Sequence, residues 1–209
     1  EIAIPYGNNL LILDLITPNQ SLDLLLPANL HHAVHNEFDA VDAALSSPLG
    51  ISQPFLRIDT STRVAITIND KTRPVPNTTL LTPLLSRLHA HGVRPENITI
   101  FIASGTHVPM VPGEYHFILD PAISSKYRII PHICDDKEQL YAIGHTSRRT
   151  PVYVNKTFFT NDLKIVVGDI ELHHFAGYSG GVKSAAIGLS GRETINHNHK
   201  FLLDENACL

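Results

Sequence analysis

The chain has 209 residues, of which 43% are hydrophobic and 17% charged, a composition that can bury the core of one large domain or two small ones. Its formal net charge of −4, without a basic cluster, argues against nucleic acid as a partner, and no apolar run reaches the ~20 residues of a membrane span. Two cysteines cannot form a disulfide framework, and no signal-peptide pattern is present, so a cytoplasmic protein is expected. Thirteen histidines are many for this length and direct attention to catalysis or metal binding.

The first 75 residues predict two strands with a helix between them. Residues 9–16 are rich in Leu and Ile, which is typical of a strand. Apolar residues then recur at helical spacing from Val34 to Leu45, with acidic residues between them, and indicate an amphipathic helix that serves packing. Residues 64–68 form a short β-branched run that predicts the second strand, and the segment 69–74 is a loop because its final proline disfavours helix.

A second helix is predicted to begin with Thr82 as its cap and Pro83 in its first turn, and to end at Gly92. The alternation of strands and helices then continues to residue 167. Its segments are a strand over 98–103, a polar loop over 104–107, a weaker helix over 113–122, a strand over 127–133, a hairpin or edge over 152–159 and a strand over 163–167. This order predicts an α/β fold, with a mostly parallel sheet covered by helices on both faces.

Polar side chains follow three of the predicted strands at the point where each strand ends. Asp70 and Arg73 follow the first, His107 follows the second, and His173 and His174 follow the last. In an open α/β sheet, ligands bind just beyond the carboxyl ends of the strands. The sequence therefore predicts that an acid, a base and a cation meet at one edge of the sheet.

These residue types suit proton transfer on an anionic substrate. The guanidinium of Arg73 can bind a carboxylate through two parallel hydrogen bonds, and Asp70 could orient that arginine or bind a sugar hydroxyl. His107 and His173 can each give and take a proton near neutral pH, so one site could act on mirror-image substrates. Taken singly, each of these residues is more often structural.

A glycine-rich turn and a second histidine pair complete the candidate set. The turn Gly177–Gly181 precedes Lys183, which could be a covalent attachment point for a cofactor. A nucleoside-triphosphate P-loop needs glycine directly before its lysine, and Val182 at that place argues against one. His199, two residues after His197, could bind nickel or zinc through its imidazole.

In order and spacing, four segments resemble the N-terminal domain of the lactate racemase family, whose larger members are nickel-pincer-nucleotide enzymes. They are Asp70–Pro74 (DKTRP), Ser104–His107 (SGTH), His173–Lys183 (HHFAGYSGGVK) and Glu193–His199 (ETINHNH). The resemblance implies a Rossmann-like domain of a two-domain enzyme. Residues 1–209 would be its N-terminal catalytic and cofactor-binding domain, and the family's C-terminal domain, which closes over the cofactor, would lie outside this chain.

The resemblance also implies how the cofactor is held. Lys183 would carry the nickel-pincer nucleotide, a pyridinium-derived mononucleotide, through a thioamide bond, and His199 would be the protein's imidazole ligand to the nickel. Asp70 would support cofactor or substrate binding. We further expect the nucleotide phosphate near exposed backbone N–H groups of two loops, at Ser104, Gly105, Thr106, Gly180 and Gly181.

The implied activity is that of an isomerase, a racemase or epimerase. It would invert the hydroxyl-bearing carbon of a 2-hydroxy acid, such as lactate or a related hydroxy or sugar acid, by reversible hydride transfer to the cofactor. Arg73 would hold the substrate carboxylate, and His107 and His173 would be the acid–base pair. The expected partners are the small-molecule substrate and the proteins that make the cofactor, with no nucleic acid or membrane.

The chain departs from the family's pattern at two places. Val182 stands where many relatives carry a basic residue beside the lysine, and Ile187–Gly188 replaces a Pro-Gly pair. Either change could alter substrate preference or cofactor loading.

Two functions of other classes stay open. One is a zinc-dependent hydrolase or lyase in which His173, His197 and His199 bind the metal and a water takes the open position. The other is a non-enzymatic domain that binds a nucleotide or sugar phosphate on the same sheet, and it would keep its ligand affinity on loss of His107 and His173.

Overall fold

A computed structural model describes residues 2–7, 9–14, 34–50, 55, 58–173, 177–205 and 207. They belong to two compact units, Glu1–His35 and Asn36–Leu209. In the first unit, β1 (Ile2–Tyr6) and β2 (Asn9–Leu13) form an antiparallel hairpin. The predicted strand over 9–16 is therefore confirmed as far as Leu13, and its predicted end lies outside the described residues.

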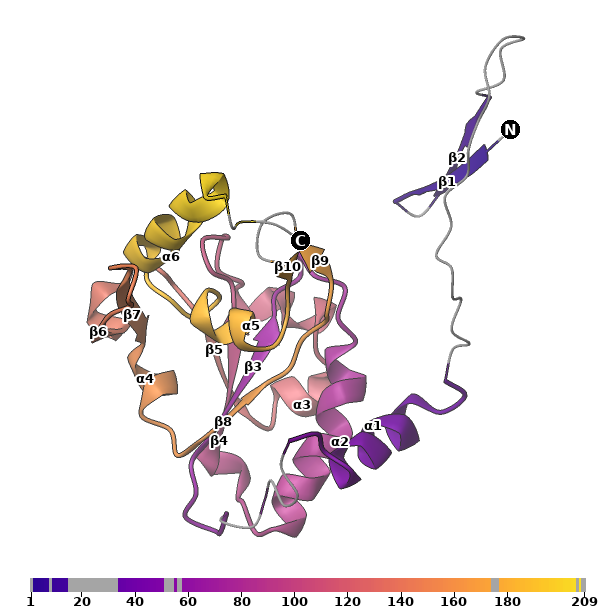
Figure 1. The fold of residues 1–209 in the computed structure, drawn as a ribbon. Helices are drawn as coiled ribbons and strands as arrows, with labels where there is room; N and C mark the ends of the chain where they lie inside the picture. The colour runs from indigo at the N-terminus through magenta and orange to yellow at the C-terminus, as the bar shows by residue number, and fades with distance from the viewer. Residues whose placement is uncertain are drawn as a thin grey trace. The chain divides into compact units, whose positions relative to one another are not determined.

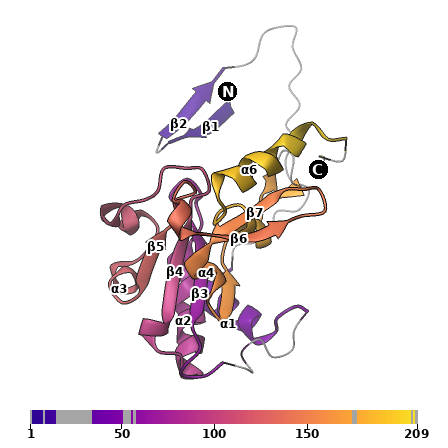
Figure 2. The same ribbon diagram turned by 90° about the vertical axis from the view of Figure 1, so that its left-hand side faces the viewer.

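The second unit is built around a four-stranded parallel sheet in the order β5-β4-β3-β8 (Figures 1 and 2). Its strands are β3 (Val64–Asn69), β4 (Ile98–Ala103), β5 (Arg128–Pro131) and β8 (Leu163–Val166). Each of these was predicted as a strand, and the parallel pairing confirms the predicted α/β fold.

The remaining elements lie around this sheet. In chain order they are α1 (Glu37–Ser46), α2 (Asn77–Ala90), η1 (Pro95–Asn97), η2 (Pro112–Phe117), α3 (Pro121–Ser124), η3 (Lys137–Gln139), β6 (Leu140–His145), β7 (Pro151–Asn155), α4 (Lys156–Phe159), β9 (Leu172–His173), β10 (Gly177–Tyr178), α5 (Val182–Ala186), α6 (Arg192–His199) and η4 (Lys200–Leu203). Within the described ranges, no helix is both long and apolar enough to cross a membrane.

Helices cover both faces of the sheet, as predicted. On one face, Ile66 and Ile68 of β3 are fully buried in a cluster that includes the leucines of α2. On the other face, Ala65 and Phe101 pack with Phe158 of α4, and the two phenylalanine rings meet edge to face at 5.7 Å. β3 is buried at all six positions because, as a central parallel strand, it is covered from both sides.

The start of α2 differs from the prediction. The helix begins at Asn77, and Pro83 lies inside it rather than in its first turn. Leu81, two residues before Pro83, is fully buried in the core, so the part of the helix before the proline packs against the sheet. Tertiary packing therefore overrides the local cost of an interior proline. The predicted end is confirmed: Gly92 follows the helix at φ +88°.

Two further predictions need adjustment. The expected helix over 113–122 is two short pieces, η2 and α3, because Asp120 caps a new start at Pro121 through the N–H of Ala122. The expected hairpin at 152–159 is present as β6 and β7, but the second strand ends at Asn155. The side chain of Asn155 then accepts from the N–H of Phe158 and begins α4.

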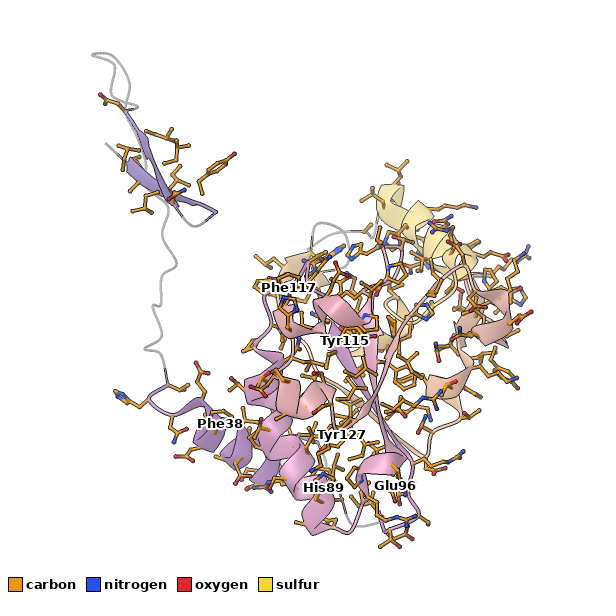
Figure 3. All side chains as sticks on the ribbon, turned by 180° about the vertical axis from the view of Figure 1, so that it is seen from behind. Phe38, His89, Glu96, Tyr115, Phe117 and Tyr127 are labelled. Atoms are coloured by element: carbon orange, nitrogen blue, oxygen red, sulfur yellow. The ribbon has the colours of Figure 1, made fainter. Side chains whose placement is uncertain are left out.

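Several of the thirteen histidines serve structure rather than chemistry. His89 on α2 donates from Nδ1 to the carbonyl of Val93 at 2.7 Å, and its Nε2 accepts from the hydroxyl of Tyr127 at 2.7 Å. These two rings lie near each other on the same side of the sheet as Tyr115 (Figure 3). The buried His132, just after β5, bonds through Nε2 to the carbonyl of Ser190 at 2.9 Å.

His132 should make the protein less stable in mild acid. Burial lowers the pKa of His132 below its ordinary value of 6.5, and the bond to Ser190 opposes this only partly. Below pH 6.5 the unfolded chain binds a proton that the folded protein does not, so the free energy of unfolding falls as the pH falls from 6.5 towards the folded-state pKa. One proton limits this slope to about 1.4 kcal/mol per pH unit. Urea unfolding from pH 8 to pH 5 measures it.

The matched variant for that experiment is His132→Gln, whose amide can still donate to the Ser190 carbonyl but cannot titrate. It should be less stable than wild type at pH 8 and should show a shallower loss between pH 6.5 and pH 5. An equal slope in both proteins would mean that another group causes the acid sensitivity.

Candidate active site

The carboxyl ends of β3, β4 and β8 open onto one cavity of about 190 Å³. Its lining includes almost all of the residues that the sequence singled out: Asp70, Arg73, Ser104, Gly105, Thr106, His107, His173, Gly180, Lys183 and His199. Gly181 does not line it, and His174 lies outside the described residues. The expectation that three strands bring these side chains to one edge is confirmed, and the chemical role of each stays a prediction.

Asp70 and His107 form a dyad at this edge. One carboxylate oxygen of the buried Asp70 accepts from the N–H of Thr72 at 2.9 Å and from its hydroxyl at 2.6 Å. The other accepts from Nδ1 of His107 at 2.7 Å. The carboxylate therefore favours the tautomer with the proton on Nδ1, and Nε2 becomes the nitrogen that can take a proton. Among the described residues, the hydrogen bonds of this carboxylate go to Thr72 and His107 rather than to the guanidinium of Arg73.

Arg73 lies on the loop after β3 and is tied to the loop after β8. Its Nη1 donates to Oε2 of Glu171 at 3.0 Å. Its backbone N–H donates to the carbonyl of Asp70, which closes a tight turn between the two residues. The loop after β3 thus carries both Arg73 and the carboxylate of the dyad, and the loop after β4 carries His107.

Lys183 enters the cavity from the first turn of α5. Burial lowers the pKa of the Lys183 ammonium, the positive charge of Arg73 lowers it further, and the carboxylate of Asp169 opposes both. The preceding turn depends on glycine: Gly180 has φ +78°, and a Cβ there would collide with the carbonyl oxygen of Asp169. A lysine with a lowered pKa holds more of the neutral, nucleophilic amine near neutral pH.

Asp169 is a cavity residue that the sequence analysis missed. Its Oδ1 accepts from the side-chain amide of Asn69 at 2.7 Å, and Ser184 donates to the other end of that amide at 3.3 Å. Its Oδ2 is buried, and no hydrogen-bond partner for it is present among the described residues. Asp169 follows β8 as Asp70 follows β3, so the strand-end rule would have found it.

The two histidines at the end of α6 point to different places. His199 lines the cavity, and its Nδ1 donates to the carbonyl of Ile195 at 2.8 Å, which leaves the lone pair of the neutral ring on Nε2. His197 instead faces Thr150, at 3.1 Å from its hydroxyl, and its ring meets Phe201. The three-histidine zinc site therefore finds no support, and within the described ranges no group of three or more His, Cys, Asp or Glu could hold a metal.

The Ser104–Thr106 loop offers fewer anion-binding groups than expected. The N–H of Ser104 bonds to the carbonyl of Ile102, and the N–H of Gly105 bonds to the carbonyl of Gly188 at 3.0 Å. Two of the three backbone donors are thus used to shape the loop. Its contribution to a phosphate would come mainly from the hydroxyl groups and the N–H of Thr106.

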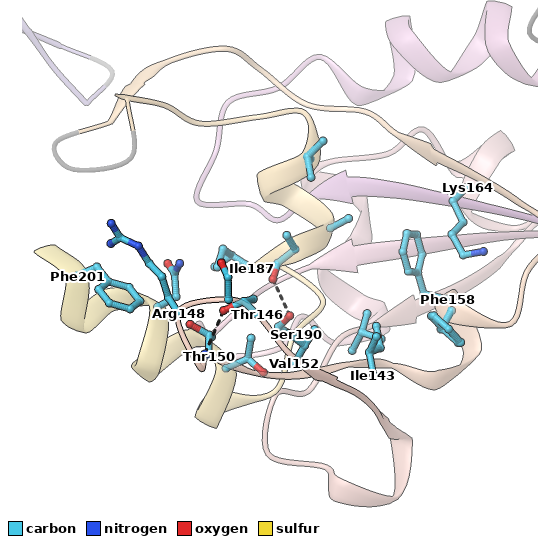
Figure 4. Close-up of a pocket in the computed structure, with 18 of the residues that line it drawn as sticks. Ile143, Thr146, Arg148, Thr150, Val152, Phe158, Lys164, Ile187, Ser190 and Phe201 are labelled. Carbon is cyan, nitrogen blue, oxygen red and sulfur yellow. Dashed lines mark hydrogen bonds between the residues drawn. The ribbon is translucent and has the colours of Figure 1, made fainter. Parts of the chain in front are cut away.

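A second, larger cavity of about 870 Å³ lies on the other side of α5 (Figure 4). Its walls are mainly apolar side chains, among them Val152 of β7, Phe158 of α4 and Phe201 of η4. Ile187 lines both cavities. The Ile187–Gly188 pair, which stands where the family has Pro-Gly, therefore lies between them. Val182 is largely exposed beside the second cavity and is absent from the lining of the first.

Comparison with known proteins agrees with this architecture. The lactate racemase of Lactiplantibacillus plantarum is 30% identical over 209 residues, which is 99% of this chain and 49% of that protein. The lactate racemase of Thermoanaerobacterium thermosaccharolyticum is 30% identical over 201 residues, covering 95% of this chain and 46% of the relative. The chain therefore spans about half the length of these curated relatives.

Solved structures share the fold. The lactate racemase apoprotein from Thermoanaerobacterium thermosaccharolyticum superimposes with a TM-score of 0.81 at 27% identity, over 99% of this chain and 48% of that one. A Thermotoga maritima crystal structure has a TM-score of 0.61 at 20% identity, over 78% of this chain and 40% of its own, and shows the fold alone. The family model described as the lactate racemase N-terminal domain matches residues 6–209, and this chain belongs to that family.

Proposed function

We propose that this chain is the catalytic and cofactor-binding part of a racemase or epimerase that acts on a 2-hydroxy acid. The observation that supports it most is that Arg73, Lys183 and three imidazoles line one cavity at the carboxyl ends of three parallel strands. The relatives named lactate racemase support the same reaction class, at 30% identity over half of their length. Lactate is one candidate among hydroxy and sugar acids.

The residues present fit the nickel-pincer nucleotide that the family implies. Lys183 supplies a half-buried amine of lowered pKa where the covalent link is expected, and His199 supplies an imidazole at the same cavity. The buried Oδ2 of Asp169 could accept a hydrogen bond from a bound molecule. At about 190 Å³ the cavity is smaller than the roughly 300–1,000 Å³ of pockets that enclose a drug-sized ligand. It would therefore enclose the substrate and only part of the cofactor.

The protein's own part in the reaction is binding and proton transfer. When bound, the cofactor would supply hydride transfer to and from C2 of the substrate. Arg73 would hold the carboxylate, which keeps C2 in place while its configuration is lost. With its Nδ1 proton held by Asp70, His107 would accept the hydroxyl proton of one substrate enantiomer at Nε2. For the other enantiomer, His173 would accept and return the hydroxyl proton.

Intact mass with peptide mapping tests the proposal, on protein produced together with cofactor-making enzymes and nickel. We expect a nucleotide-sized addition on the peptide that contains Lys183, and none on the Lys183→Arg variant, because arginine cannot form the amide-type link. Lys156→Arg is the matched control, since Lys156 is an exposed lysine on α4 and should leave the addition unchanged.

An unmodified Lys183 in the whole protein, under conditions that load a known lactate racemase, would reject the proposal. Metal analysis and phosphate-ligand binding on that protein would then separate the two other functions. A tightly held metal without a covalent adduct would favour the zinc enzyme, and ligand affinity that survives loss of His107 would favour the binding domain.

A further inference from the structure

Arg73 and Glu171 form an ion pair between two loops that are 98 residues apart in the chain. The pair uses a single guanidinium nitrogen, Nη1, at 3.0 Å from Oε2 of the glutamate. Within the described part of the chain, Nε and Nη2 of Arg73 make no hydrogen bond. Both side chains are 41% exposed, and a pair of that kind contributes little stability. The main effect of the pair is therefore expected on the positions of the two side chains rather than on stability.

Glu171 is fixed to the hairpin that carries His173. The N–H of Ser179 donates to the carbonyl of Glu171 at 2.8 Å, and the N–H of Glu171 donates to the hydroxyl of Ser179 at 3.3 Å. These bonds continue the β9–β10 pairing, in which His173 lies opposite Gly177. Glu171 comes directly before β9, two residues before His173. The carboxylate that holds Arg73 is therefore carried by the segment that leads into the hairpin of His173.

We propose that Glu171 is a positioning residue that sets the distance between the carboxylate-binding Arg73 and His173. It holds the guanidinium by one edge and leaves the remaining donors for the substrate carboxylate, which matches them in bidentate fashion. The proposal rests on the function proposed above. Without Glu171, the long arginine side chain regains its rotamer freedom and the hairpin loses its tie to the loop after β3.

The competing role for the same contact is shielding, in which Glu171 occupies the place of the substrate carboxylate on Arg73. The two roles predict opposite changes on removal of the glutamate. Positioning predicts weaker substrate binding in Glu171→Ala, and shielding predicts tighter binding. The sign of the change in KM therefore decides between them.

Steady-state kinetics on the loaded whole protein measure that sign. Glu171→Ala should lower kcat/KM for the 2-hydroxy acid by about 10–100-fold, because small misplacement of a substrate-holding group has effects of this size. Glu171→Gln keeps a hydrogen-bond acceptor and should recover part of the loss. In an Arg73→Ala background, Glu171→Ala should have no further effect, since the two residues act as a unit. Independent, additive effects or a lower KM would overturn the proposal.

Glu114→Gln is the matched control. Glu114 also pairs with a basic residue of the same loop, Lys71, but it does not line the cavity. Its neutralisation should leave kcat/KM close to wild type. An equal loss in Glu114→Gln would mean that any charge change near this loop disturbs catalysis.

Hydrogen–deuterium exchange gives a readout that does not need turnover. Arg73→Ala and Glu171→Ala should each speed exchange at the amide of Ser179, which bonds to Glu171, and Glu114→Gln should not. Unchanged exchange in both variants would overturn the positioning role. If wild-type protein turned over no hydroxy acid while exchange changed as expected, the proposed function would fail and the tie between the two loops would stand.

Discussion

Replacing His107 or His173 with asparagine is expected to lower turnover by roughly 10²–10⁴-fold, the usual contribution of a positioned acid or base. Both side chains line the cavity that Arg73 and Lys183 share. Asparagine is close in size and polar, so it should preserve the loops while removing the proton acceptor. Initial rates from each hand of the substrate, on protein with equal cofactor content by mass, measure the effect.

His116→Asn is the control for these two variants. His116 lies exposed on η2 outside the cavity, with its ring against Phe117, and its loss should leave turnover close to wild type. Turnover within tenfold of wild type in His107→Asn or His173→Asn would remove that residue from the acid–base role. If a variant only contained less cofactor, with normal turnover per bound cofactor, the replaced histidine would act in cofactor attachment instead.

Asp70→Asn should cost nearly as much as the loss of His107 itself. The carboxylate of Asp70 accepts the Nδ1 proton of His107 on one oxygen and the two donors of Thr72 on the other. In asparagine, the oxygen would stay with Thr72 and the amide N–H₂ would face the imidazole. The ring would then carry its proton on Nε2 and could no longer act as a base there, so turnover should fall by roughly 10²–10⁴-fold with little change in fold.

A variant that combines Asp70→Asn with His107→Asn tests whether the two residues act together. Because Asp70 is expected to act through His107, Asp70→Asn should add little to His107→Asn. Asp162→Asn is the matched control: that carboxylate pairs with Arg63 at the opposite ends of the strands, and both groups are about half exposed. Full activity in Asp70→Asn, or a full additional loss in the double variant, would show that Asp70 does not work through the imidazole.

The proposed site also explains why one cavity contains charges of both signs. Arg73 and Lys183 lie near enough for the arginine to lower the pKa of the lysine, and Asp169 partly offsets this. Glu171 places a further negative charge 3.0 Å from Nη1 of the guanidinium. A substrate carboxylate would add a further negative charge beside Arg73, so its binding would weaken the repulsion between the two cations.

Sequence alone determined the fold class and the edge of the sheet at which the candidate site residues lie. The short length and β-branched composition of runs such as 64–68 and 98–103 favour buried strands, the segments between them favour helices, and parallel strands end on the same side. The strand-end rule therefore brought Asp70, His107 and His173 together without any knowledge of distance. It applied equally to Asp169, which follows β8.

Only the tertiary structure decided how these side chains are paired. Asp70 had Arg73 three residues away and His107 thirty-seven residues away, and local spacing cannot choose between them. His197 and His199 are separated by about 200° around a helix, so only the packing of α6 decides which of them enters the cavity. The same holds for α2, where burial of Leu81 outweighed the start signal of Pro83. Local sequence sets which groups are available, and long-range packing sets their distances, because the free energy of burial exceeds that of any single cap or turn.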